Sequence, residues 1–205
     1  MLGNGRPFVV ELVNPRRVVF TPDEMAALQA EINRSPAVQV LHLQQVSPTD
    51  ADIIHEGQAS KRKRYLALIW GTNMRDFEAH DILIHQKTPI RVMHRRALMT
   101  RPRTVYDLRI VKITGEYGVM FVETEAGTYI KEFVHGDLGR TTPSVCEILG
   151  CDCDILSLDV IGVCLAFPPP CRDEPLPEVS FDVPPFVALD ERARQFCREK
   201  ISENQ

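Results

Sequence analysis

The sequence lacks several features that would place it in a familiar class. Its six cysteines never form a CxxC pair, which argues against a zinc ribbon. No apolar run approaches membrane-spanning length, and the N-terminus has no charged-then-apolar signal. There is no metal-binding motif, nucleotide-binding motif or internal repeat. We therefore expect no metal, no nucleotide or organic cofactor, no membrane insertion, and the reduced thiols typical of a cytoplasmic or nuclear protein.

The chain does have enough residues for one domain with a sizeable core, or for one domain with an appendage. Its net charge of −4 does not indicate a nucleic-acid partner. The segment from Gln86 to Lys112, called the basic segment here, has the opposite balance, with eight cations against Asp107 alone. Such a run is either a solvated face or the footprint of an anionic partner.

Apolar periodicity and turn residues predict the elements of the first half. Thr21, Pro22 and Glu24 form a helix start with a capping box, and Pro36 ends that helix near Ser35. Residues 47–60 are polar and predict a loop. Strands are predicted at 8–13, 17–20, 38–46 and 65–70, and a short helix within 74–85.

In the second half, a hairpin is predicted around Gly115, between strands at 105–113 and 117–124. A helix at 143–149 with Thr142 as its cap and a strand at 156–167 follow. After Phe167 the composition shifts to proline, which predicts an extended linker and a terminal helix within 185–201.

Between those elements lies the string GTYIKEFVHGDLGRT, residues 127–141. Ile130, Phe133 and Val134 share one helical face, with Thr128 as a plausible cap and Gly136 or Gly139 as the stop. Lys131 then points away from that face. From the pattern alone, this is a short helix with one snorkelling lysine.

The same string resembles the last signature of pseudouridine synthases. It is most similar to the tRNA pseudouridine synthase family numbered ten. KRYLALIW at 63–70 resembles that family's KxYxALIW segment, and QKTPIRVMHRR at 86–96 resembles its QKTPLRVLHRR block. The resemblance covers residues 2 to about 167.

The resemblance implies an α+β fold with a mixed, largely antiparallel sheet, helices packed on one side and a cleft on the other. Residues 1–167 would be the catalytic-type domain, and 168–205 a Pro-rich linker with a C-terminal tail or helix. The implied activity is isomerisation of uridine to pseudouridine in the TΨC arm, at tRNA positions 54 and 55. It needs no cofactor, and the partner is tRNA, bound by a monomer.

By resemblance, Tyr65 stacks on the extruded base and acts in proton transfer near its carbon, for which a flat apolar ring with a polar tip is suited. Lys131 would pair with the catalytic aspartate and keep it ionised, and Tyr129 would line the uridine pocket. The alternatives are a packing tyrosine at a strand mouth and the snorkelling lysine.

The basic segment would lie along the bound tRNA, because arginine forks suit phosphate without reading sequence. A solvated face is the alternative, and for the histidine a structural role. The residues expected to contact RNA are Lys87, Arg91, His94, Arg95, Arg96, Arg101 and Arg103.

The family's nucleophile is an aspartate in a GREDVDVR-type loop just upstream of the LGNGRPF stretch, and this sequence does not contain that loop. Asp50, Asp52, Asp76, Asp81 and Asp137 do not fit the motif. Three hypotheses follow: a synthase whose sequence is cut short, a non-catalytic tRNA-binding remnant, and an unrelated interaction module that works through its Pro-rich tail.

Overall fold

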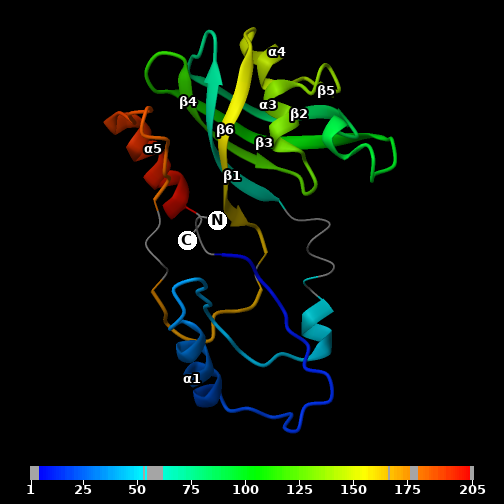
Figure 1. The fold of residues 1–205 in the computed structure, drawn as a ribbon, viewed down its shortest axis with the longest axis vertical. Helices are drawn as coiled ribbons and strands as arrows, with labels where there is room; N and C mark the ends of the chain where they lie inside the picture. The colour runs from blue at the N-terminus through cyan, green and yellow to red at the C-terminus, as the bar shows by residue number, and fades with distance from the viewer. Residues whose placement is uncertain (1–4, 53, 55–61, 166, 176–179, 204–205) are drawn as a thin grey trace. The chain divides into compact units, whose positions relative to one another are not determined.

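The computed structural model describes residues 5–52, 54, 62–165, 167–175 and 180–203, which group into two compact units (Figure 1). The larger unit takes Gly5 and the described residues from 62 to 164 and from 180 to 203; the smaller takes those from 6 to 54 and from 165 to 175. This grouping by compactness differs from the boundary at Phe167, which came from composition. The domain division at that residue stays a prediction.

The smaller unit contains the helix predicted from the capping box. In α1 (Pro22–Ile32) the Thr21 side chain accepts from the Glu24 amide, and the Glu24 side chain accepts from the Thr21 amide. The strands predicted at 8–13, 17–20 and 38–46 are wrong, because no described residue of this unit pairs in a sheet. Side chains bind these segments instead: Gln45 Nε2 donates to the Val18 carbonyl over 2.6 Å.

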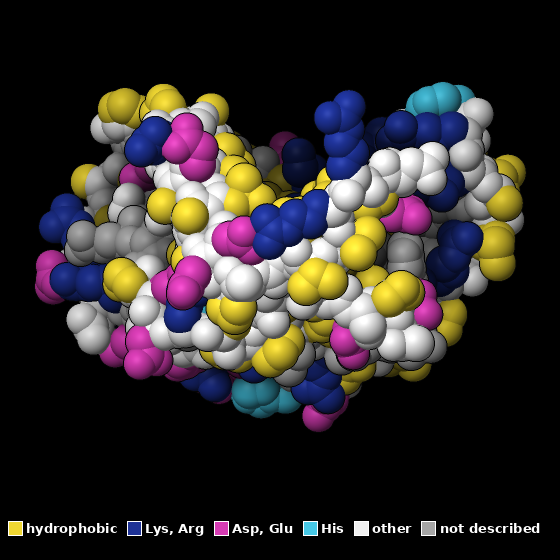
Figure 2. Space-filling model, turned by 90° about the horizontal axis from the view of Figure 1, so that it is seen from below, with side chains coloured by type: hydrophobic (Ala, Val, Ile, Leu, Met, Phe, Trp, Pro, Cys, Tyr) yellow, Lys and Arg dark blue, Asp and Glu magenta, His cyan; other side chains and the backbone are white. Residues whose placement is uncertain are grey.

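One other expectation for this region is wrong in part. Residues 48–52 are helical, although the polar composition of 47–60 predicted a loop; the rest of that stretch lies largely outside the described residues. The segment at 8–13 keeps its apolar side chains at the surface, and Val13 is 77% exposed. On the face shown in Figure 2, hydrophobic side chains lie in separate groups among charged ones.

The larger unit is built on a six-stranded sheet in the order β5-β2-β3-β4-β1-β6, and its paired strands are antiparallel. The expected α+β class with a largely antiparallel sheet is therefore confirmed. The predicted hairpin is present as β3 and β4. The strands are β1 (Lys63–Gly71), β2 (Phe77–Lys87), β3 (Thr100–Lys112), β4 (Tyr117–Thr124), β5 (Thr141–Thr142) and β6 (Cys153–Val163).

The helix predicted within 74–85 is wrong, since those residues enter β2. Ten residues of β2 have register partners on β3, from Phe77 opposite Ile110 to Lys87 opposite Thr100. The strand is irregular at Asp81, whose φ is 52°. Non-local pairing overrides the local pattern here, as often happens for strands.

Helices pack on both faces of the sheet (Figure 1). The first face packs against α3 (Ile130–His135) and α4 (Val145–Leu149), around Phe133 and Val145. The second face packs against α5 (Glu191–Ser202), around Phe121 and Cys197. The expectation of helices on one face and an open cleft on the other is therefore wrong.

Capping details also differ from the predictions. Ser144, not Thr142, caps α4 in a capping box with Glu147. Thr128 does not cap α3, because its hydroxyl donates to the Glu125 carbonyl over 2.7 Å. Gly136 ends α3 in the left-handed conformation, as predicted. Among the described residues, no helix has the length and apolarity needed to cross a bilayer.

Candidate active site

A pocket of about 250 Å³ opens on the α3 face of the sheet, beside the first turn of that helix. It brings together Tyr65, Tyr129 and Lys131, three residues that sequence analysis proposed for one site. Its volume is just below the usual range for small-ligand pockets. The lining residues are Tyr65, Arg91, Thr128, Tyr129, Ile130, Lys131 and Leu158.

Tyr65 reaches the pocket because of the alternation of β1. Residues 65, 67 and 69 point toward the α3 face, and residues 66 and 68 toward the α5 face. Tyr65 is half-buried, packs against the cluster that contains Ala67, and lies opposite Val122 in the register. The neighbouring strands thus fix the direction of its ring.

Tyr129 is held at the start of α3 by a buried amide that sequence analysis missed. Its backbone N–H donates to Gln86 Oε1 over 2.9 Å, and Gln86 Nε2 donates to its carbonyl over 3.0 Å. Gln86 is 3% exposed and has the same β2 alternation as Ile84, which is fully buried. The sequence contains one indication of this role: Gln86 is a polar residue at the alternating positions of β2 that are otherwise buried or half-buried, and a buried amide needs hydrogen-bond partners.

Lys131 is exposed on the first turn of α3 and lines the pocket. Among the described residues that line this pocket, none carries a carboxylate. The aspartate that the family resemblance pairs with Lys131 is thus not found there. Asp50 accepts from Ser47, Asp76 pairs with Arg192, and Asp137 accepts from the Ile90 amide.

Arg91, on the short 3-10 helix η1 (Ile90–Val92), is fixed at the pocket by Glu132. The Arg91 Nε–Glu132 Oε1 distance is 2.5 Å, and the Glu132 side chain is only 2% exposed. The hydrogen bond and charge of Glu132 raise the pKa of the Arg91 guanidinium, with burial opposing them. The guanidinium carbon lies 5.7 Å from the centre of the Tyr129 ring. Arg91 is therefore held over the pocket by a buried carboxylate.

The loop that carries the middle of the basic segment is anchored at its base. Thr88 Oγ1 donates to the Ala97 carbonyl over 2.6 Å and accepts from the Met99 amide over 3.0 Å. Residues 88–99, called the 88–99 loop here, then present His94, Arg95 and Arg96 as exposed side chains. Lys87 is exposed at the end of β2.

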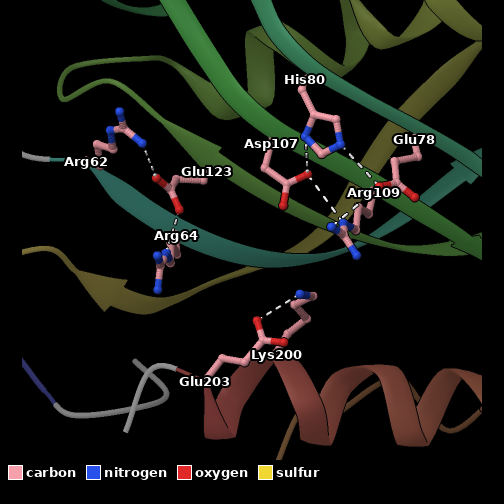
Figure 3. A network of polar contacts seen from close by, with 9 residues as sticks. All are labelled: Arg62, Arg64, Glu78, His80, Asp107, Arg109, Glu123, Lys200 and Glu203. Atoms are coloured by element: carbon pink, nitrogen blue, oxygen red, sulfur yellow. Dashed lines mark hydrogen bonds and ion pairs between the residues drawn. The ribbon is translucent and has the colours of Figure 1, made fainter.

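The remaining cations of the basic segment do not form one surface. Arg101 and Arg103 share a face of β3 with Val105, which packs on the α3 face of the sheet. Arg103 is paired there, because its Nη1 donates to Glu125 Oε1 over 2.8 Å. Figure 3 shows Arg109 beside Asp107 and Glu78. Pairing with Asp107 and with acidic residues outside the segment thus offsets part of the positive charge of the basic segment.

The described residues contain no group of three His, Cys, Asp or Glu side chains placed to hold a metal ion. All six cysteines are free thiols. The Cys151 and Cys153 sulfur atoms lie 3.6 Å apart, and neither residue lines the pocket that contains Lys131.

Most of this chain is similar in sequence to known proteins. Residues 1–164 match the family described as "Pus10, C-terminal". The chain is 45% identical over 179 residues to a tRNA pseudouridine synthase Pus10 of Xenopus laevis, covering 84% of this chain and 35% of that protein. It is 41% identical over 171 residues to the Archaeoglobus fulgidus protein of the same name, covering 80% and 46%.

A chain in a crystal structure of a Cbf5-Nop10-Gar1 complex is also similar, with 23% identity and a TM-score of 0.40 over 54% of this chain and 33% of that one. The chain spans between about a third and a half of the length of the two curated relatives. The family match covers most of the chain, including each residue proposed for the pocket. This chain belongs to the Pus10 C-terminal family.

Proposed function

We propose that this chain forms the base-binding half of a tRNA pseudouridine synthase that acts on uridine in the TΨC arm, at tRNA positions 54 and 55. The observation that carries the proposal is the convergence of Tyr65, Tyr129 and Lys131 on one pocket. The relatives named as tRNA pseudouridine synthases support it.

The reaction is an isomerisation, so atoms balance without a cofactor. The bond from the ribose C1′ to the base N1 breaks, a bond from C1′ to C5 forms, and the C5 proton leaves while N1 gains one. The base must leave the helical stack to be reached. An aspartate would attack either the sugar or the base ring to open this exchange.

Three of the pocket residues have roles in this scheme. The Tyr65 ring stacks on the extruded base, and its hydroxyl takes part in moving the C5 proton. The Lys131 ammonium keeps the attacking aspartate ionised, because an opposite charge within about 4–6 Å favours the charged form. Tyr129, fixed by Gln86, forms the pocket wall.

The aspartate itself is not among the described residues that line the pocket. We propose that it comes from a GREDVD-like loop, which this sequence does not contain. The basic residues Lys87, Arg91, Arg95, Arg96, Arg101 and Arg103 would contact tRNA phosphates, together with His94. The monomeric state and a cytoplasmic or nuclear location stay predictions.

A turnover assay on unmodified tRNA tests the proposal, with pseudouridine detected by chemical labelling and primer extension. We would compare this chain with a version carrying a GREDVD-like loop at its N-terminus. The extended chain should make pseudouridine, and this chain alone should bind tRNA without turnover. If neither chain makes pseudouridine although both bind tRNA, the chain is a binding module without the chemistry.

In the extended chain, Tyr65→Phe should fold and bind tRNA but lose turnover by about two to four orders of magnitude, the usual contribution of a proton-transfer group. Tyr117→Phe, the same change at a tyrosine that does not line the pocket, is the matched control. If Tyr65→Phe turns over at the rate of the extended chain with Tyr65 intact, the tyrosine has no part in proton transfer and only a stacking role remains for it.

A further inference from the structure

The turn after α3 contains four successive residues with positive φ. The angles are 79° at Gly136, 48° at Asp137, 56° at Leu138 and 78° at Gly139. Glycine adopts this region freely, whereas a residue with a Cβ is strained in it. Strained non-glycine residues persist where the surrounding structure or a function requires them. Asp137 and Leu138 therefore each need a reason.

The reason for Asp137 lies within the chain. Its Oδ2 accepts from the Ile90 amide over 3.1 Å and lies 3.6 Å from Arg140 Nε. No such reason exists for Leu138 within the described residues, since its side chain is 91% exposed. Glycine would hold this turn with less strain and without placing an apolar side chain in water. The leucine is thus better explained by something that binds to it.

The surroundings of Leu138 restrict what that partner can be. Arg140 Nη2 donates to the Thr88 carbonyl over 2.7 Å, and the Arg140 carbonyl accepts from the Lys87 amide over 2.8 Å. The turn is therefore fixed to the start of the 88–99 loop. Residues 87–103 include six cations and no acidic residue. An apolar tip in such a basic setting fits nucleic acid, because the flat faces of the bases are apolar and the phosphate backbone is anionic.

The turn also lies at a suitable distance from the pocket. Lys131 lines the pocket, and Gly136 ends the same helix five residues later. An α-helix advances about 1.5 Å per residue, which gives about 8 Å, a little more than two stacked base steps of about 3.4 Å. If a nucleotide binds in the pocket, this span would put Leu138 within reach of the bases that flank it.

We propose that Leu138 is an apolar wedge that enters the RNA stack beside the target uridine when that base is extruded. The inference rests on the proposed function. Apolar side chains inserted between base steps are a known way to stabilise unstacked nucleic acid. Leu138 is then a positioning residue: it does not touch the reacting atoms, but holds open the conformation that delivers the base to Tyr65.

The test uses this chain with a T-arm RNA hairpin that carries 2-aminopurine next to the target uridine. Fluorescence of 2-aminopurine rises when it unstacks, and wild-type protein should produce that rise. Leu138→Gly should reduce the rise on the order of ten-fold at saturating protein, while the free energy of unfolding stays equal or increases because glycine suits the positive φ. Leu138→Met should restore the signal.

Leu12→Gly is the matched control, because Leu12 is 62% exposed and lies outside both the basic segment and the turn after α3. It should leave the signal unchanged. A Leu138→Gly protein that folds and gives the wild-type signal overturns the wedge and leaves the proposed function standing. If Leu138→Gly fails to fold, Leu138→Asn, which also tolerates positive φ, decides in the same way. Wild-type protein that does not bind the hairpin at all would refute the proposed function itself.

Discussion

At the residue scale, Glu123 connects the second face of the sheet to two arginines. Arg64 Nε donates to its Oε2 over 2.6 Å, and Arg62 Nη1 donates to its Oε1 over 3.1 Å (Figure 3). Burial would raise the pKa of Glu123, but the hydrogen bonds and charges of Arg64 and Arg62 outweigh it and hold the pKa below its ordinary value of 4.5. The carboxylate thus favours the folded state as long as it is ionised.

A carboxyl group with a depressed pKa gives stability above its unfolded pKa and loses it as the pH falls through the folded pKa. We therefore expect the wild-type free energy of unfolding to fall between pH 7 and pH 3 by on the order of 1 kcal/mol more than that of Glu123→Gln. Urea unfolding across this range measures the difference. The exposed Glu11→Gln is the control, and a variant curve parallel to that of the wild type would refute the assignment.

Sequence analysis found the pocket residues whose roles depend on their side-chain chemistry. Tyr65, Tyr129 and Lys131 stand in recognisable strings, and the structure brings them together. Gln86 and Glu132 were missed because they act on other residues of the site and not on a substrate. Gln86 acts on the backbone of Tyr129 and Glu132 on the guanidinium of Arg91. Tertiary packing brings these groups together, so the sequence alone does not show the roles.

At the element scale, α5 lies against the second face of the sheet through a polar anchor and an apolar stripe. Arg192 donates to the Lys112 carbonyl over 2.7 Å and pairs with Asp76, while Cys197 is 4% exposed in the apolar contact. Burial raises the pKa of the Cys197 thiol to about 12. Since the thiolate is the reactive form, this cysteine should react with alkylating reagents only when α5 opens.

Arg192→Ala should therefore increase the rate of Cys197 alkylation about three- to five-fold, equivalent to roughly 0.7–1 kcal/mol for the loss of an exposed ion pair. Peptide mass spectrometry after timed labelling measures the rate, with the exposed Cys164 and Cys171 as internal references. Arg198→Ala is the matched control on the same helix, because Arg198 pairs with Glu191 within α5. Equal rates for the two variants would show that Arg192 does not anchor the helix.

Elements with a local cause were predictable, and those with a distant cause were not. The capping box at Thr21 acts within four residues, so α1 could be placed from sequence. Most of the segment at 74–85 becomes a strand because β3 is beside it, whereas the apolar segment at 8–13 pairs with no strand among the described residues. Local propensity contains no information about the adjacent strand, and that strand decides whether the segment becomes part of a sheet.

At the scale of the whole molecule, the net charge of −4 hides a local excess of cations. Arg95 and Arg96 project from the 88–99 loop and are exposed. If they contact phosphates, each releases bound counterions, and the logarithm of the association constant falls with the logarithm of salt by about 0.7–0.9 per contact.

Arg95→Ala/Arg96→Ala should weaken tRNA binding and reduce that salt slope by about 1.5. Filter binding or fluorescence anisotropy between low and moderate salt measures it. Arg194→Ala/Arg198→Ala, which removes two exposed arginines from α5, is the matched control and should change the slope little. A slope unchanged by the first pair would assign the RNA contact to another surface.

Strand β1 serves both hydrophobic clusters, with Ala67 and Ile69 in one and Leu66 and Leu68 in the other. Because side chains alternate, a shift of one residue would send every side chain of the strand to the opposite face. An insertion or deletion within Lys63–Gly71 would therefore send the side chains on one side of the change to the opposite core, unless a bulge absorbs it. A change that shifts the register of Tyr65 would empty part of one core and turn the tyrosine away from its pocket in the same step.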